Sequence, residues 1–257
     1  MGFIVLEGGA EFGGRMAVPD RLAIQLAGGP DALICILPTA AAPDDNHQRA
    51  GQNGVNWFKH LGATNVACLP LIDKTSANDP AIVDTLSQAG LVYLLGGFPR
   101  HLAQTLRESR SWQAILSAHQ AGAVIAGSSA GAMVLCEYYY APESSRVVEG
   151  LKLMDGVCVL PHHNTFGKTW VERASSLLPD IVLLGIDEET GVVCNKSEGI
   201  GRVLGKGQIT IYHNDLTDKF EPEEEFSLAL LNISRSVSTQ LGNDAVNTWR
   251  RRSNADR

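Results

Sequence analysis

The chain has 257 residues, of which 44% are hydrophobic and 19% are charged, with a formal net charge of −7. This ordinary globular composition excludes a coiled coil and an intrinsically disordered chain. The negative charge argues against nucleic acid or an anionic membrane as a partner.

The five cysteines stand alone in mostly apolar segments, and no Cys-x-x-Cys pair occurs. Isolated thiols of this kind are typical of a reducing compartment, so we predict a cytoplasmic protein without disulfides. The first residues lack the basic segment of a secretion signal. No stretch approaches the ~18 apolar residues of a membrane span. No residue cluster has zinc-ligand spacing, and we expect no metal and no cofactor.

Short apolar segments alternate with amphipathic ones through the first two thirds of the chain. Strands are expected at 3–8, 32–39, 65–72, 91–97 and 122–127. Helices are expected between them at 19–28, 46–62, 79–90 and 100–122. Near-continuous apolar strands separated by helices are typical of a parallel sheet covered on both faces.

The pattern changes after about residue 157, where short strands follow one another closely. They are expected at 156–161, 181–187, 191–195, 201–205, 207–212 and 226–232. The turn GKGQ at 205–208 predicts a hairpin between two of them. We therefore expect one α/β domain over residues 1–250, with a mostly parallel sheet and a C-terminal antiparallel extension. Residues 251–257 are polar, which predicts a frayed tail.

A glycine- and serine-rich turn separates the apolar strand at 122–127 from an apolar segment, 130–140, that we predict to be helical. The sequence GSSAG at 127–131 fits the G-x-S-x-G nucleophile elbow, which lifts its central side chain above the sheet. The alternative is a glycine-rich crossover between strand and helix. The flanking strand and helix favour Ser129 as a nucleophile, with the Ala130 N–H as a donor to an oxyanion.

An activated serine needs a histidine base and an acid that orients the base. His162 and His163 follow an apolar strand, where the active sites of open α/β sheets collect. Either histidine could be the base. Asp187 and Glu188 follow another strand, although acids at such positions are usually turn residues. Gly96 and Gly97 end an earlier strand and could bring a second backbone N–H to the oxyanion, although a plain turn is the alternative.

With these residues identified, the sequence resembles the serine-peptidase family of cyanophycinase and peptidase E (aspartyl dipeptidase). The likeness covers most of the chain and lies in GGAE at 8–11, PTAA at 38–41, GGFP at 96–99, GSSAGA at 127–132 and GIDE at 185–188. The elbow is the specific motif among these, and the others support it.

The resemblance implies a flavodoxin-like three-layer fold and a catalytic triad of Ser129, His162 and Glu188. It further implies an oxyanion hole formed by Gly97 and Ala130 and a small peptide as substrate, and it allows a homodimer. The residues expected to contact the substrate are Phe98, His163, Asn164 and Lys168.

The chain departs from the family where cyanophycinases carry DQHF followed by an arginine cluster. Here the segment reads LPHH at 160–163, and only Lys168 and Arg173 could replace the cluster. We therefore expect a peptidase for aspartyl or β-aspartyl bonds that lacks the cyanophycin pocket. Two alternatives are a binding protein of the same fold without turnover, and an α/β-hydrolase-type esterase. The esterase would draw its acid from Glu143, Glu149 or Asp155. Nucleotide binding through the glycines at 8–14 is excluded by their spacing.

Overall fold

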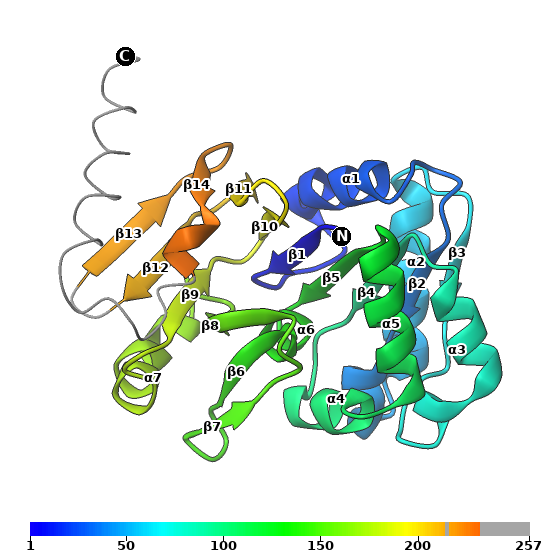
Figure 1. Ribbon diagram of the computed structural model, residues 1–257, viewed down its shortest axis with the longest axis horizontal. Coiled ribbons are helices and arrows are strands. Elements are labelled where there is room, and N and C mark those ends of the chain that lie inside the picture. The colour runs from blue at the N-terminus through cyan, green and yellow to red at the C-terminus, as the bar shows by residue number, and fades with distance from the viewer. Residues whose placement is uncertain (214–215, 232–257) are drawn as a thin grey trace.

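The main sheet has eight strands in the order β14-β11-β10-β1-β5-β4-β2-β3 in the computed structural model, which describes residues 1–213 and 216–231 (Figure 1). Its parallel strands are β1 (Ile4–Glu7), β2 (Ile34–Leu37), β3 (Val66–Cys68), β4 (Leu91–Leu94) and β5 (Val124–Ser128). Three strands continue the sheet antiparallel beyond β1, namely β10 (Thr190–Asn195), β11 (Ile200–Gly205) and β14 (Glu225–Ser227). The predicted parallel sheet with its C-terminal antiparallel extension is therefore confirmed.

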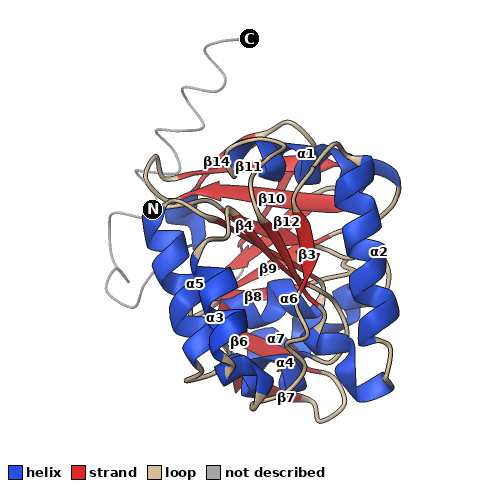
Figure 2. Ribbon diagram, turned by 90° about the vertical axis from the view of Figure 1, so that its right-hand side faces the viewer, coloured by secondary structure: helices blue, strands red, loops and turns tan. Residues whose placement is uncertain are grey.

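Helices cover both faces of this sheet (Figure 2). One face carries α1 (Ala17–Leu26) and α2 (His47–His60). The other carries α3 (Pro80–Ser87), α4 (Pro99–Leu106), α5 (Arg110–Ala121) and α6 (Ala130–Leu135). Val5 belongs to the first core, whereas Ile4 and Leu6 belong to the second, because successive side chains of a strand point to opposite faces. The short 3₁₀ helices are η1 (Gly14–Met16), η2 (Thr39–Asp44), η3 (Ser76–Asn78), η4 (Gly167–Trp170) and η5 (Leu228–Leu231).

A second sheet, not foreseen from the sequence, has six strands in the order β13-β12-β9-β8-β6-β7. They are β6 (Cys136–Ala141), β7 (Arg146–Glu149), β8 (Met154–Leu160), β9 (Val182–Ile186), β12 (Ile209–His213) and β13 (Leu216–Phe220). Val157 and Leu184 join the main core on one face of this sheet. Leu160 and Leu183 pack on the opposite face, the one that α7 (Val171–Leu177) covers. The core of the protein therefore lies between the two sheets as well as beneath the helices.

Two sequence predictions are wrong because strand pairing overrides the local pattern. The expected helix at 130–140 ends at Leu135, and the three tyrosines that follow pair with β7 as part of β6. Aromatic side chains favour strands once a partner strand is present. The GKGQ segment does not close a hairpin, since β11 pairs in the main sheet and β12 pairs with β9 in the second.

Two further boundaries differ from the prediction. The expected helix at 100–122 is divided into α4 and α5, because Glu108 adopts a φ of 58° and Ser109 caps α5 by accepting a hydrogen bond from the Trp112 N–H at 3.0 Å. The segment expected to be a strand at 226–232 turns from β14 into η5, and its last residue lies outside the described residues. The tail at 251–257 also lies outside them, and the single domain over 1–250 stays a prediction.

Candidate active site

Ser129 occupies the turn between β5 and α6 and has φ 49° and ψ −110°. A positive φ is strained for any residue with a Cβ, so contacts on both sides must hold this turn. The Ser129 N–H donates to the Glu7 carbonyl at 3.0 Å. A Cβ at Gly131 would lie 2.2 Å from the Leu94 carbonyl oxygen, so only glycine lets α6 approach β4 this closely. The predicted strand, tight turn and helix are all present around Ser129.

His162 follows β8 and faces Ser129. Its Nε2 lies 3.0 Å from the Ser129 Oγ, and its Nδ1 lies 2.8 Å from Glu188 Oε1. The His162 N–H donates to the Gly8 carbonyl at 2.7 Å, which ties the loop after β8 to the loop after β1. These distances fit a neutral imidazole that donates its Nδ1–H to Glu188 and accepts the serine proton at Nε2, with the tautomer assigned from the hydrogen-bond partners.

Glu188 follows β9, the strand beside β8, and its backbone N–H donates to Asn164 Oδ1 at 2.9 Å. Asn164 was expected to contact substrate, but its side-chain oxygen instead holds the turn that carries Glu188. The side chains of His162 and Glu188 are 20% and 34% exposed, so the pair lies at an accessible edge of the sheet.

His163 has a different environment, although it is the next residue along the chain. It is 4% exposed, and its Nε2 lies 3.0 Å from the Tyr212 hydroxyl. Its Nδ1 lies 3.4 Å from Asp187 Oδ1, an ion-pair distance rather than an aligned hydrogen bond. The ring occupies the space that a side chain at Gly185 would need. His163 is thus enclosed by protein atoms, and its contact with substrate stays a prediction. Of the two histidines only His162 lies within hydrogen-bond distance of Ser129.

Ser129 and His162 open onto a cavity of about 570 Å³, which we call the imidazole-side cavity. Gly97, with a φ of 134°, and Phe98 also line it. Ala130 is almost fully buried beside the serine. Lys168 is exposed on η4 and lines neither this cavity nor the groove described next.

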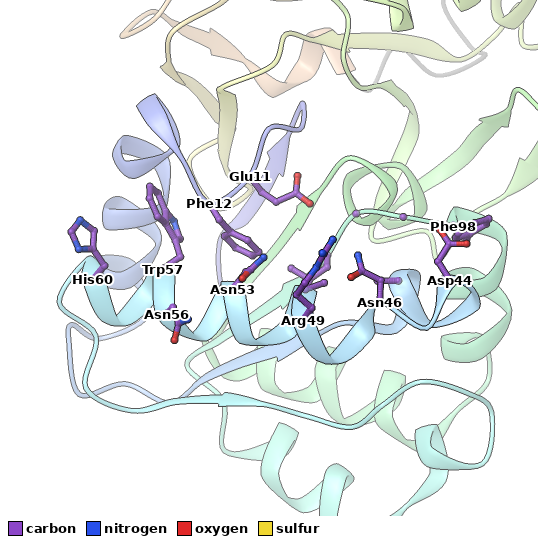
Figure 3. Close-up of a pocket in the computed structure, with 15 residues that line it drawn as sticks. Glu11, Phe12, Asp44, Asn46, Arg49, Asn53, Asn56, Trp57, His60 and Phe98 are labelled. Atoms are coloured by element: carbon purple, nitrogen blue, oxygen red, sulfur yellow. The ribbon is translucent and has the colours of Figure 1, made fainter.

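A groove of about 610 Å³ continues from the other side of Gly97 and Phe98 and runs along α2, as Figure 3 shows. We call it the α2 groove. Ala50 and Trp57 line its helix side together with five polar residues, Asn46, Arg49, Asn53, Asn56 and His60. Their spacing of three and four residues places them on one helix face, a signal that was present in the sequence but was not recognised. Glu11 lies opposite and accepts a hydrogen bond from the Ser128 hydroxyl at 3.1 Å.

The acids proposed for an α/β-hydrolase-type esterase do not contact the imidazole. Glu149 lies 3.1 Å from Arg107 and also pairs with Lys152. Glu143 lines the imidazole-side cavity, and Asp155 lies at a separate pocket beside Lys196. Glu188 instead lies beside His162 Nδ1, where an esterase of this type would have Glu143, Glu149 or Asp155.

The cysteines offer no competing nucleophile. All five are free, four are buried, and Cys68 is half-buried. Burial raises the pKa of Cys35, Cys158 and Cys194 to about 12. Thiols with such pKa values stay protonated at neutral pH and are therefore poor nucleophiles.

Two buried carboxyl groups lie behind the elbow. Glu7 and Asp20 are fully buried, and the Tyr93 hydroxyl donates to Glu7 while Trp57 Nε1 donates to Asp20 at 2.7 Å. Burial, and then the charge of Asp20, raises the pKa of Glu7 well above its usual value. Burial raises the pKa of Asp20 to about 7. One carboxyl oxygen of Glu7 and one of Asp20 have no hydrogen-bond partner. A proton shared between the two carboxyl groups would give these oxygens a partner.

Within residues 1–213 and 216–231, no helix is long and apolar enough to cross a membrane. The same part of the chain holds no group of three or more histidine, cysteine or acidic residues that could bind a metal ion.

A serine at a strand–turn–helix elbow, beside a histidine and a glutamate at the edge of a layered α/β sheet, defines a serine hydrolase. The model of peptidase family S51 matches residues 4–200. The chain therefore belongs to peptidase family S51 and is a serine peptidase, as the resemblance in its sequence indicated.

Known relatives agree with this family. The cyanophycinase of Synechococcus elongatus is 29% identical over 221 residues, which cover 82% of this chain and 67% of the relative. The cyanophycinase of Nostoc sp. is 30% identical over 208 residues, which cover 76% of this chain and 68% of the relative. The crystal structure of a peptidase from an acI-B1 actinobacterium superposes with a TM-score of 0.79 at 28% identity, over 88% of this chain and 97% of that one. The match to that structure supports the flavodoxin-like class of fold.

Proposed function

We propose that Ser129, His162 and Glu188 form the catalytic triad of this peptidase. The supporting observation is the unbroken line of hydrogen bonds, 3.0 Å from Ser129 to His162 and 2.8 Å from His162 to Glu188. His162 takes the serine proton as Ser129 attacks the carbonyl carbon of the scissile bond. Glu188 fixes the imidazole tautomer and stabilises the imidazolium that forms.

The developing oxyanion accepts hydrogen bonds from the N–H groups of Gly97 and Ala130. Ala130 is the first residue of α6, so its N–H has no acceptor within the helix. Gly97 lines the same cavity as Ser129, and neither N–H donates to another described residue. Donors already aimed at this position stabilise the tetrahedral intermediate without reorganisation.

The second half of the reaction uses the same groups in reverse. His162 gives its proton to the leaving nitrogen, which breaks the C–N bond and releases the amine product. A water molecule then loses a proton to His162 and attacks the acyl-enzyme, releasing the acid product and restoring Ser129.

The substrate that we propose is a small peptide with an N-terminal aspartyl or β-aspartyl residue. Such a residue carries a free ammonium group and a free carboxylate in either linkage. The α2 groove offers a charge for each, since Arg49 lines it together with Glu11 and Asp44. Two curated relatives are named cyanophycinase. The LPHH segment of this chain differs from the DQHF of that family, and we therefore propose short peptides rather than cyanophycin itself.

The test is labelling with a fluorophosphonate together with hydrolysis of aspartyl and β-aspartyl dipeptides. Ser129→Ala is expected to lose the label and about 10⁶-fold in kcat, as removal of other serine nucleophiles does. Ser128→Ala is the matched control, because the Ser128 hydroxyl donates to Glu11 rather than to the imidazole. Residual activity of Ser129→Ala within tenfold of the wild type would contradict the triad. A folded wild type that neither labels nor hydrolyses any of these peptides would point to a binding protein of the same fold.

A further inference from the structure

The imidazole-side cavity has aromatic walls that the proposed chemistry does not use. Phe98 is 43% exposed and Phe166 is 50% exposed. Only Met1, Leu177 and Leu216 are comparably exposed among the large apolar side chains of the described residues. Two of these five side chains therefore lie within one cavity, at the nucleophile. Exposed apolar side chains that gather in a concave site are typical of ligand binding.

The aromatic rings form a continuous series that begins at the imidazole. Phe166 stacks on His162 with ring centroids 4.7 Å apart and an angle of 25° between the ring planes. Trp170 lies 5.4 Å from Phe166, and Tyr140 lies 5.8 Å from Trp170. Phe166 and Trp170 are four residues apart, as the N-cap and the last residue of η4. Packing against one another holds these rings in place, so they offer a preformed surface.

The remaining wall of the cavity is also largely apolar. Its apolar side chains are Phe98, Pro99, Met133, Pro142, Pro161, Phe166 and Trp170. Arg100 and Glu143 are the charged residues of the lining apart from the histidines, and their charges are opposite. A cationic side chain could stack on the aromatic rings, but Arg100 and Glu143 bring opposite charges to the lining, so the cavity has no excess of negative charge to attract a cation. The composition favours an uncharged, apolar occupant.

The position of the imidazole decides which part of a peptide enters this cavity. His162 must deliver its proton to the leaving nitrogen, so that nitrogen lies on the His162 side of Ser129. The imidazole-side cavity includes both residues, whereas the α2 groove includes neither. The acyl residue of the substrate therefore lies toward the α2 groove, and the residue that leaves lies toward the aromatic walls.

We propose that the imidazole-side cavity is a subsite for an apolar or aromatic side chain on the leaving residue of the peptide. This inference rests on the proposed triad. The enzyme then cleaves between a small charged residue and an apolar one, and an arginine in the leaving position is disfavoured.

The first experiment compares kcat/KM for three dipeptides, Asp-Phe, Asp-Ala and Asp-Arg, each in the α- and β-linked form. The wild type is expected to prefer phenylalanine to arginine by about tenfold or more, the discrimination that an apolar pocket provides. Trp170→Ala is expected to remove most of this preference by lowering kcat/KM for Asp-Phe toward that for Asp-Arg. The control is Leu177→Ala, an exposed apolar side chain on α7 that does not line the cavity, and it should leave the preference unchanged.

Phe98→Ala serves as the second variant, because Trp170 also packs on Tyr140 and its loss could impair folding. Thermal unfolding shows whether each variant folds. A wild-type preference for arginine over phenylalanine would overturn the proposal. It would also be overturned if folded Trp170→Ala and Phe98→Ala both kept the wild-type ratio.

Binding to Ser129→Ala separates this inference from the proposed chemistry, because it requires no turnover. Calorimetry with the same dipeptides is expected to show a Kd for Asp-Phe at least about tenfold below that for Asp-Arg. Equal, weaker or undetectable binding of Asp-Phe overturns the subsite. Preferential binding of Asp-Phe without turnover by the wild type would count against the triad alone and would support the subsite.

Discussion

Two histidine–acid pairs lie one residue apart in this protein, and their surroundings differ. His162 and Glu188 face the cavity with side chains 20% and 34% exposed, whereas those of His163 and Asp187 are 5% and 8% exposed. Both pairs come from the same two segments, which follow the neighbouring parallel strands β8 and β9. Adjacent residues at a strand end point to opposite sides. Both pairs join a histidine to a carboxylate, so their orientation is what places one pair in the proposed triad and the other in the interior.

The buried pair of His163 and Asp187, which we call the inner pair, has further polar partners within the fold. The His163 N–H donates to the Ile186 carbonyl at 3.0 Å, and Asp187 Oδ2 accepts from the Gln208 N–H at 3.1 Å. Together with Tyr212 these contacts tie β8, β9 and the turn before β12. Buried polar groups need such partners to offset their lost hydration. We expect the inner pair to contribute to stability, and the outer pair of His162 and Glu188 to contribute to catalysis.

Replacing the two acids should give the largest contrast between the pairs. Glu188→Gln is expected to lower kcat by about 10³–10⁴-fold, because an amide cannot enforce the imidazole tautomer or balance its charge. Asp187→Asn keeps the shape of the inner acid and should lower kcat by less than about tenfold, far less than Glu188→Gln. Steady-state hydrolysis of an aspartyl dipeptide measures both. Equal losses in the two variants would break the distinction between the pairs.

Replacing the inner histidine should change stability more than rate. His163→Ala leaves a cavity and deprives Asp187 and Tyr212 of their partner, at a cost of about 2–3 kcal/mol of unfolding free energy. For a chain of this size that corresponds to a fall in Tm of roughly 4–12 °C. Differential scanning calorimetry measures the change, with His60→Ala on the exposed end of α2 as the control. An unchanged Tm for His163→Ala would show that the inner pair is dispensable.

The buried carboxyl groups of Glu7 and Asp20 extend this comparison to the dependence of stability on pH. Burial raises the pKa of Asp20 from 3.8 to about 7, so between these values the folded state holds a proton that the unfolded state has lost. The contribution of Asp20 to stability is therefore fully present at low pH and is lost as pH rises toward 7, by at most about 1.4 kcal/mol per pH unit.

Asp20→Asn keeps an acceptor for Trp57 and cannot ionise, so it should flatten this pH dependence. Relative to the wild type, the variant should be more stable at pH 8 than at pH 5. Urea unfolding across that range measures the difference, with the exposed Asp84→Asn as the control. Parallel pH profiles for wild type and Asp20→Asn would contradict the assignment of the proton to this pair.

Much of the site could be read from local sequence because each of its parts is a local structure. The elbow needs only a strand, a tight turn of small residues and a helix, and all three lie within residues 124–135. The antiparallel extension was equally visible as short strands. By contrast, β6 was read as helix because an apolar tyrosine-rich segment fits both structures until its partner strand is known.

The sequence by itself determined the alternation of strands and helices, the family and the segments from which the serine, the histidine and the acid come. Only the tertiary structure decided which of two adjacent histidines meets the serine, and that β11 and β12 belong to different sheets. It alone placed Phe98, which precedes α4, in one cavity with Phe166 and Trp170, which follow β8. The physical reason is that these outcomes depend on contacts between distant segments, and a local pattern carries no information about which segments pack together.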